Sequence, residues 1–402
     1  MTDGAPPRGT GRPRLLQIFP GESRGGVERY CLAVAAAAVK HGWNAHAAFP
    51  PRGATQDLRD DYARSGVATH RLEIPDLRFR TARTLRELLP PLARTAALLA
   101  RLRPDVVHVN LPWPDHGAGV VRACSLLGVP AVVVFHLVPE GFPVDAFRVG
   151  HIAGARRTRQ RWVTVSRAAR DIVSGWFGVE RGEIAVVPNG VPLPGRVPDT
   201  AERAAAHRAV CGDFGWPPDT ALLLTTARLA PQKGFDDLLA AAPDVLARHP
   251  GARFLWAGGG DVNGHRESVR GAGLEGKVVP AGHRTDVDRL LAAADLFVLP
   301  TRFEGLPFAL LEAMAAGVPV VSTTANGVTE VVTHEEHGLL AAAGDPRALA
   351  AMLNRALDDP AAMRAAAGRA RVRVEEFGEE RMLAATLALL GDAAAGRGKG
   401  GR

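Results

Sequence analysis

Cysteine is scarce in this sequence, with only Cys31, Cys124 and Cys211 among 402 residues. The three are far apart and show no metal-ligand or redox spacing. A bound metal is therefore not expected. Buried thiols in a reducing cytoplasm are the expectation instead.

Long apolar runs are also missing. No stretch reaches the roughly 18 residues that a membrane-spanning helix needs. The polar segment 1–14 is followed by an apolar run over 15–19, which is too short for a signal peptide. These features predict a cytoplasmic protein that is soluble or at most peripheral at the inner face of a membrane.

Aromatic residues make up only 5% of the chain. The pI of about 10.0 suggests a nucleic-acid partner. Interleaved aromatics and a recognition motif are both lacking, however, so no nucleic acid is expected as a partner. The Ala/Arg/Gly-rich composition is typical of a bacterium with a GC-rich genome.

Positive charge is concentrated in the first half of the sequence. Residues 1–195 contain 26 Lys/Arg and 16 Asp/Glu, whereas residues 196–402 contain 23 and 26. This asymmetry indicates that the first half meets an acidic ligand or an anionic surface. The Arg-rich stretch 77–103 could lie on anionic lipid. Pro90 and Pro91 interrupt that stretch, and a solvated helix face is an equal alternative.

Two α/β domains are expected, because 402 residues exceed what one core usually supports. Short Val/Ile/Leu/Ala-rich runs alternate with helical stretches, which predicts parallel sheets covered on both faces. Predicted strands are 15–19, 45–49, 68–74, 106–109, 131–135, 162–165, 184–187, 222–226, 254–257, 277–280, 296–299 and 318–322. Predicted helices include 27–41 and others that begin near Gly234, Asp286, Pro307, Gly327, Pro346 and Glu379.

A cluster of turn formers over 188–195 predicts a hinge. We expect Rossmann-like domains over 1–192 and 193–375, a C-terminal helix over 376–392 that returns to the first domain, and a disordered tail over 393–402. Ligands bind at the carboxyl ends of parallel strands, so the cleft between two such domains is the expected site.

The segment 301–319 is the most informative. Pro307 suits a first helical position and Gly317 a C-terminal cap, which predicts a helix of about ten residues. Glu304 precedes this helix and Glu312 lies within it. A helix N-terminus binds anions, and flanking carboxylates accept hydrogen bonds from sugar hydroxyls. As an isolated pair, the two glutamates would more commonly be a solvated loop acid and a surface acid.

A second segment places Arg228 and Lys233 around a Pro-containing turn, between a strand and a helix. Two cations beside a helix N-terminus suit a pyrophosphate, because Arg supplies a planar fork and Lys a mobile charge. Surface charge is the usual alternative.

Glycines and histidines provide weaker signals. Gly25 and Gly26 follow the first strand and allow close approach to a ligand, although a tight turn is the plainer interpretation. His108 and His136 fall near strand ends, where cleft residues collect. A core histidine is the alternative for each.

Together these segments resemble the family-4 retaining glycosyltransferases of the GT-B fold. The likeness extends over nearly the whole chain, and its most specific part is the pair Glu304 and Glu312, eight residues apart. Its segments are 25–28, 105–108, 135–136, 165–166, 188–191, 228–234, 282–287 and 304–312.

The resemblance implies transfer of a hexosyl unit from a UDP- or GDP-sugar to a hydroxyl acceptor in glycan, glycolipid or natural-product biosynthesis, without cofactor or metal. The first domain would bind the acceptor and the second the nucleotide sugar. Catalytic roles would fall to Arg228 and Lys233 on the diphosphate, and to Glu304 and His136 at the sugar. The donor site would further comprise Gly25, Gly26, Glu312 at the ribose, His283 and Arg284 at the base, Gly305, Leu306 and Pro307.

Departures from the family pattern affect the acceptor side and the sugar loop. Asn110 stands where a second His is usual, and Pro192 stands where an acidic residue is usual. The segment 325–330 stands where the family has a Gly-Gly-x-x-Glu motif. Candidate acceptor residues are His108, Asn110, Asp115, His116 and Glu140. A nucleotide-sugar epimerase or hydrolase on the same fold is the main rival, whereas a glycoside hydrolase would not need the Arg/Lys pair.

Overall fold

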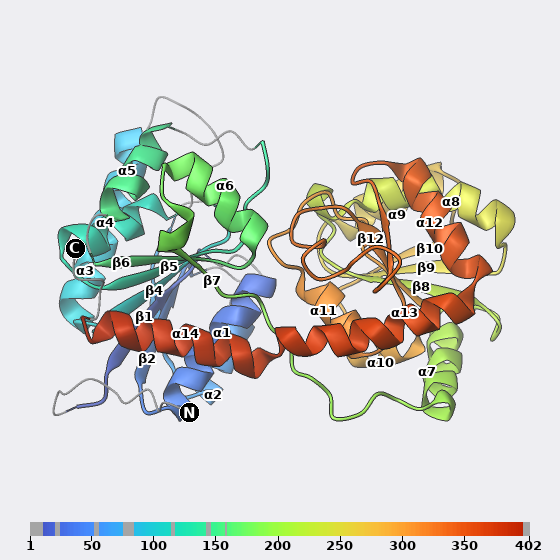
Figure 1. Ribbon diagram of the computed structural model, residues 1–402, viewed down its shortest axis with the longest axis horizontal. Helices are drawn as coiled ribbons and strands as arrows, with labels where there is room; N and C mark the ends of the chain where they lie inside the picture. The colour runs from blue at the N-terminus through green and yellow to red at the C-terminus, as the bar shows by residue number, and fades with distance from the viewer. Residues whose placement is uncertain are drawn as a thin grey trace. The chain divides into compact units, whose positions relative to one another are not determined.

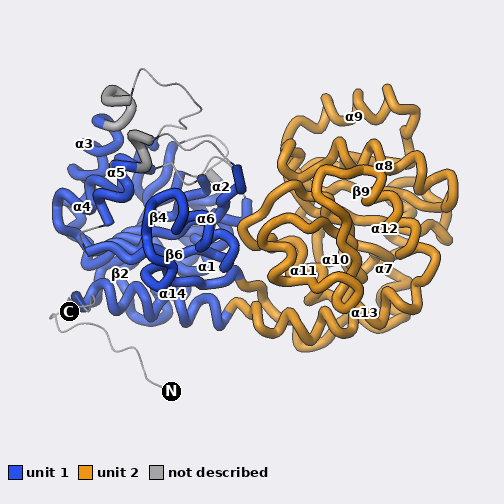
Figure 2. Tube along the Cα trace, turned by 45° about the horizontal axis from the view of Figure 1, so that its top comes forward, with its two compact units in different colours: residues 1–189, 380–402 blue, residues 190–379 orange. Residues whose placement is uncertain are grey.

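The structure, a computed structural model, describes residues 11–20, 25–51, 56–74, 84–113, 117–141, 146–156 and 159–396. The chain divides into two compact units (Figure 2). Unit 1 comprises residues 1–189 and 380–402, and unit 2 comprises residues 190–379. Each unit contains its own parallel sheet.

Unit 1 contains a seven-stranded sheet in the order β3-β2-β1-β4-β5-β6-β7. Its strands are β1 (Arg14–Ile18), β2 (Asn44–Phe49), β3 (Ala68–Arg71), β4 (Val106–Leu111), β5 (Ala131–Phe135), β6 (Gln160–Thr164) and β7 (Ile184–Val186). The strand order changes direction between β1 and β4, where Gln17 pairs with His108. Ligands bind at the carboxyl ends of strands beside such a switch point.

Helices cover both faces of this sheet, which is why β4 and β5 are buried at every position. Figure 1 shows α1 and α14 on one face and α4 and α5 on the other. The helices are α1 (Gly26–Lys40), α2 (Gln56–Arg64), α3 (Thr84–Leu102), α4 (Ala118–Leu126), α5 (Ala146–Arg156), α6 (Arg167–Phe177) and α14 (Glu379–Ala394), with a short 3-10 turn η2 (Arg181–Glu183).

The C-terminal helix α14 packs on unit 1, although it follows unit 2 in the sequence. The hydroxyl of Tyr30, on α1, lies 3.3 Å from the hydroxyl of Thr386, on α14. Met382, Leu390 and Ala393 are buried on the same helix. Helix α14 therefore completes one face of the sheet of unit 1.

Unit 2 contains a six-stranded sheet in the order β10-β9-β8-β11-β12-β13. Its strands are β8 (Ala221–Thr226), β9 (Ala252–Ala257), β10 (Val278–Gly282), β11 (Leu296–Val298), β12 (Val320–Thr323) and β13 (Leu339–Ala341). The switch point lies between β8 and β11, where Leu223 pairs with Leu296.

The sheet of unit 2 is also covered on both faces, with α8, α9 and α12 on one and α10 and α11 on the other (Figure 1). Local signals start several helices: Asp199 and Glu202 form a capping box, and Asp345 and Asp359 cap two later helices. The helices are α7 (Thr200–Asp213), α8 (Phe235–Arg248), α9 (Val262–Gly271), α10 (Val287–Ala293), α11 (Phe308–Ala315), α12 (Pro346–Asp358) and α13 (Pro360–Arg373), with 3-10 turns η3 (Pro231–Lys233) and η4 (Val374–Phe377).

The predicted fold class is confirmed, since both units are α/β with parallel sheets, and each predicted strand overlaps an observed one. The helix predicted near Gly327 is wrong. Residues 326–331 form turns, because Gly327 has a φ of +77° and a Cβ there would lie 2.2 Å from the carbonyl oxygen of Gly305. Helix α3 continues through Pro90 and Pro91, which were expected to interrupt it.

The tail expected over 393–402 overlaps helix α14, which ends at Ala394, while residues 397–402 lie outside the described residues. Within the described part of the chain, no helix has both the length and the apolar character needed to cross a membrane.

Candidate active site

Two loops meet at the switch point of unit 2, one after β8 and one after β11. The first carries Arg228 and Lys233, and the second carries Glu304. Lys233 ends the 3-10 turn η3, and Gly234 then leads into α8. A parallel sheet collects such residues at this edge because all its strands end there.

Gly234 brings the two loops into backbone contact. Its φ is +75°, and a Cβ at this position would lie only 1.9 Å from the carbonyl oxygen of Pro300. Glycine is the residue that tolerates both the left-handed conformation and the close approach. The backbone amide of Arg302 further donates to the carbonyl oxygen of Gln232 over 2.8 Å.

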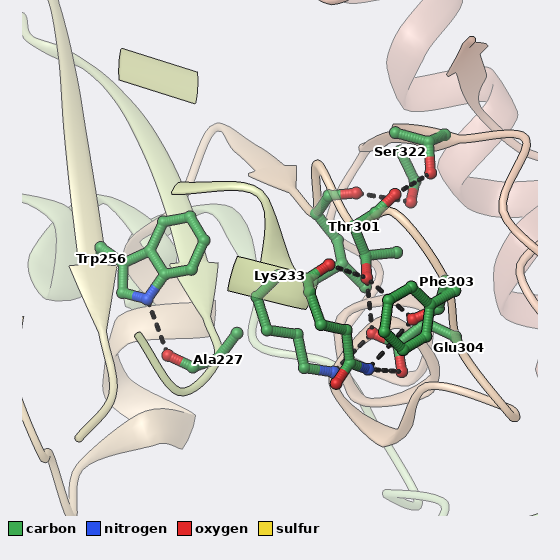
Figure 3. Close-up of polar contacts among 10 residues, drawn as sticks. Ala227, Lys233, Trp256, Thr301, Phe303, Glu304 and Ser322 are labelled. Atoms are coloured by element: carbon green, nitrogen blue, oxygen red, sulfur yellow. Dashed lines mark hydrogen bonds and ion pairs between the residues drawn. The ribbon is translucent and has the colours of Figure 1, made fainter. Parts of the chain in front are cut away.

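This contact pairs Lys233 with Glu304 (Figure 3). The Lys233 Nζ lies 2.5 Å from Glu304 Oε1, and the Thr301 hydroxyl donates to the same oxygen over 2.9 Å. Glu304 is 6% exposed and the Lys233 side chain 18%. Glu304 is therefore not the solvated loop acid that is more common for an isolated glutamate, because Lys233 and Thr301 both contact its carboxylate.

Arg228 differs from Lys233. Its side chain is exposed, and it has no hydrogen-bond or ion-pair partner within the described ranges. The neighbouring backbone is held firmly, since the carbonyl oxygen of Ala227 accepts from the Trp256 indole over 2.7 Å (Figure 3). An exposed, unpaired guanidinium on a rigid loop can bind a phosphate in two-pronged fashion.

The start of α11 offers a second binding element. Pro307 is the N-cap, no side chain caps the helix, and its first turn contains no acidic residue. Its free backbone N–H groups and helix dipole favour an anion. Gly305, Leu306 and Pro307 are buried in the loop that leads to it, and Glu312 is half-buried on the helix itself.

Sequence reasoning missed the residues that hold these loops together. Arg302 forms a two-pronged ion pair with Asp237 on α8, at 2.8 and 2.9 Å. Gln232 Nε2 donates to the carbonyl oxygen of Phe303 over 3.0 Å. Thr301 and Arg302 shortly precede Glu304 in the sequence, but nothing in the sequence distinguishes them from other loop residues.

The predicted base-binding pair follows β10. His283 is exposed, whereas Arg284 forms a two-pronged pair with Asp286 at 2.8 Å. Arg284 holds the pKa of Asp286 well below its usual range, and Arg289 adds to the effect. The Arg284 side chain is thus committed within the protein, and its backbone groups are what it offers to a ligand.

In unit 1, Gly25 is the N-cap of α1 and Gly26 its first residue, without a side-chain cap. Residues 21–24 of the same loop lie outside the described residues. Gly25 and Gly26 therefore stand at an uncapped helix start beside the switch point of unit 1.

His108, Asn110 and His136 form a buried network at the carboxyl ends of β4 and β5. His136 Nε2 lies 3.0 Å from Asn110 Oδ1, and Asn110 Nδ2 donates to the backbone oxygen of His108 over 3.3 Å. Burial lowers the pKa of His108 to about 3; burial and the neighbouring His108 do the same for His136. Both imidazoles are therefore neutral at neutral pH.

The acceptor candidates divide into three groups. His108 and Asn110 are 0% exposed, so no acceptor can touch their side chains in this structure, and their role as direct contacts is withdrawn. Glu140 is exposed in a turn after β5. Asp115 and His116 lie outside the described residues.

Comparison with solved structures defines the fold. The HepE protein of Anabaena, in complex with UDP and glucose, matches with a TM-score of 0.75 at 19% identity, over 94% of this chain and 100% of that one. The two Rossmann-like units thus have the GT-B architecture. This likeness concerns the fold alone.

Sequence comparison identifies the family. Residues 24–193 match the model described as Glycosyltransferase Family 4, and residues 220–359 match Glycosyl transferases group 1. D-inositol 3-phosphate glycosyltransferase of Kineococcus radiotolerans is 31% identical over 312 residues, 70% of each chain. Glycogen synthase of Mycobacterium tuberculosis is 30% identical over 290 residues, which span 68% of this chain but only 64% of that protein. This chain belongs to glycosyltransferase family 4.

Proposed function

We propose that this protein transfers a hexosyl unit, with retention of configuration, from a UDP- or GDP-sugar to a hydroxyl acceptor. The observation that carries the proposal is the cationic pair at the switch point of unit 2. Arg228 is exposed and unpaired among the described residues, and Lys233 lies 2.5 Å from a buried carboxylate. The setting suits a ligand with a diphosphate beside a sugar.

Each element would have a distinct task. Arg228, Lys233 and the N-terminus of α11 would stabilise the charge that develops on the departing nucleoside diphosphate, a role that divalent ions fill in other enzymes. Glu304 would accept hydrogen bonds from sugar hydroxyls, and Glu312 from the ribose. The backbone at His283 and Arg284 would border the base.

Gly25, Gly26 and His136 would contact the donor, and Glu140, Asp115 and His116 would serve the acceptor. The acceptor hydroxyl would attack the anomeric carbon on the face from which the diphosphate leaves and would pass its proton to that phosphate. No covalent intermediate on the protein is required. The relatives named above differ in substrate, which leaves the donor base and the acceptor open to screening.

A thermal-shift screen against UDP-, GDP-, dTDP- and ADP-sugars tests the donor site. A ligand that binds only the folded state at a hundred times its Kd stabilises it by about 2.7 kcal/mol. We expect a shift with one base class, its loss in Lys233→Met, and its retention in Lys277→Ala. Lys277 is an exposed cation of unit 2 that precedes β10, at the opposite end of the strands. An equal shift in Lys233→Met and the parent protein would remove the assigned site.

Product analysis by NMR tests the reaction itself. A retained glycoside that appears only with a hydroxyl acceptor supports transfer. A free, epimerised sugar formed without acceptor would instead make the protein an epimerase, and a free sugar of unchanged configuration would make it a hydrolase.

The charge of the first 195 residues supports a cytoplasmic protein with peripheral contact to anionic lipid. On α3, Arg94 and Arg101 are exposed, as is Leu89. Sedimentation with vesicles should depend on their anionic lipid content. Sedimentation that is equal with neutral and anionic vesicles argues against this contact.

A further inference from the structure

A buried polar network crosses one face of the sheet in unit 1, beneath α1. It links Gln17 of β1, His108 and Asn110 of β4, and His136, which directly follows β5. The ring of Tyr30 contacts both imidazoles, with centroid distances of 5.8 Å to His108 and 4.8 Å to His136.

The orientation of the Asn110 amide determines which nitrogen of His136 carries the proton. Asn110 Nδ2 donates to the backbone oxygen of His108, so Oδ1 points to His136 Nε2 at 3.0 Å. An amide oxygen can only accept a hydrogen bond, and a neutral imidazole has one donor and one acceptor nitrogen. The proton of His136 therefore lies on Nε2, and Nδ1 keeps a lone pair.

His136 Nδ1 is buried and has no hydrogen-bond partner among the described residues. Because Nδ1 can only accept, the group that satisfies it must donate. A hydroxyl can donate, whereas an ionised phosphate or carboxylate oxygen cannot. The neutral state of His136 at neutral pH agrees with this assignment.

We propose that Asn110 is a positioning residue that fixes His136 in the Nε2–H tautomer and thereby makes Nδ1 a hydrogen-bond acceptor for a ligand hydroxyl. The identity of that hydroxyl, on the donor sugar or the acceptor, rests on the proposed function; the tautomer does not. Asn110 stands where the family resemblance led us to expect a histidine. The amide oxygen supplies a fixed acceptor that does not titrate.

His108 is set in the same way by a different amide. The Tyr62 hydroxyl donates to Gln17 Oε1 over 2.9 Å, which turns Gln17 Nε2 toward His108 Nδ1 at 3.2 Å. His108 thus carries its proton on Nε2, and this atom is buried without a partner in the part of the chain that the structure describes. Both imidazoles therefore carry their proton on Nε2, which leaves His136 Nδ1 without a donor and His108 Nε2 without an acceptor among the described residues.

Nitrogen-15 NMR of histidine-labelled full-length protein tests the tautomer directly, with His136→Gln to assign the signals. We expect His136 Nδ1 unprotonated and Nε2 protonated at neutral pH. In Asn110→Leu, which removes the amide, we expect a mixture of tautomers, provided that the melting temperature shows a folded protein. A protonated Nδ1 in the parent, or an unchanged single tautomer in folded Asn110→Leu, would overturn the proposal even if transfer activity is present.

Asn110→Asp provides a functional readout in a variant of nearly equal size. A carboxylate beside Nε2 favours the imidazolium, whose Nδ1 then donates instead of accepting. Burial keeps the neighbouring Tyr30 and His108 neutral. We expect kcat to fall at least tenfold toward acid pH and to recover toward alkaline pH, with the acid limb shifted upward from that of the parent protein.

The matched control is Asn44→Asp, an exposed residue at the start of β2 with the same charge change, which should keep the parent profile. An unshifted profile in Asn110→Asp would overturn the positioning role. If the parent protein shows no transfer at all, the proposed function fails while the NMR result still decides the tautomer.

Discussion

Replacement of Lys233 by Met should destabilise the loops after β8 and after β11, because it leaves the Glu304 carboxylate buried without its cation. Glu304 is 6% exposed, and its Oε1 accepts from Lys233 at 2.5 Å and from Thr301 at 2.9 Å. Breaking a buried ion pair from one side costs roughly 3–5 kcal/mol, against about 0.2–1 kcal/mol for an exposed pair. Since Thr301 still donates, we expect a local loss of about 3 kcal/mol.

The double variant Lys233→Met/Glu304→Gln removes both charges and should recover about half of that loss. This recovery distinguishes an uncompensated charge from a simple loss of packing. Lys277→Met, at an exposed position, should cost less than about 0.5 kcal/mol.

Hydrogen exchange measured by mass spectrometry on peptides from residues 296–312 is the appropriate assay, because a chain of two units need not unfold in one step. A loss below about 1 kcal/mol in Lys233→Met, as at a surface pair, would refute the argument. A double variant as unstable as the single one would refute it as well.

Three further outcomes are expected. Burial lowers the pKa of His108 and of His136 to about 3 in the folded protein, against about 6.5 in the unfolded state. The unfolded state therefore binds more protons as pH falls, and each histidine should lower the free energy of unfolding by about 2 kcal/mol between pH 8 and pH 5. A flat stability profile in chemical denaturation would contradict the neutral burial of the two histidines. Gly234→Ala should cost about 3 kcal/mol or more of stability and abolish the donor-induced thermal shift, because its Cβ would lie 1.9 Å from the carbonyl oxygen of Pro300. The control Gly251→Ala should be nearly neutral, because no atom lies within 4 Å of a Cβ at that position. Equal melting temperatures of the two variants would count against the close contact. Arg228→Ala should raise the donor KM about tenfold with an unchanged melting temperature, and Arg228→Lys should restore only part of the lost donor affinity. EDTA should leave the rate of the parent protein unaltered. A destabilised Arg228→Ala variant or an EDTA-sensitive rate would require a different account of the diphosphate site.

The fold was predictable because, in a parallel α/β protein, the apolar runs of the sequence coincide with the strands that helices bury on both faces of the sheet. Strands such as β5 are short apolar runs between helices, and the predicted and observed bounds of β5 coincide. Strand β13 was missed because it has only three residues after a polar loop. The helix expected near Gly327 failed because tertiary contact with Gly305 decides that segment.

The candidate site was predictable in its residue types but not in its contacts. Glu304 lies in a loop and Glu312 in the helix that follows it, and the sequence predicted both positions because the two residues are only eight apart. The pairing of Lys233 with Glu304 joins residues 71 apart, and Gln17 reaches His108 across 91 residues. Such pairs depend on strand order, which the sequence alone does not specify.

The backbone contact between Gly234 and Pro300 limits how this protein could be redesigned. A Cβ at Gly258 would similarly lie 1.8 Å from the carbonyl oxygen of Ala227. With no side chain between them, the segments have no flexible atoms that could absorb a change in loop length or course. The loop after β8 and the loop after β11 would have to be grafted together from a relative to alter the proposed donor preference, because the backbone of each loop packs directly against the backbone of the other.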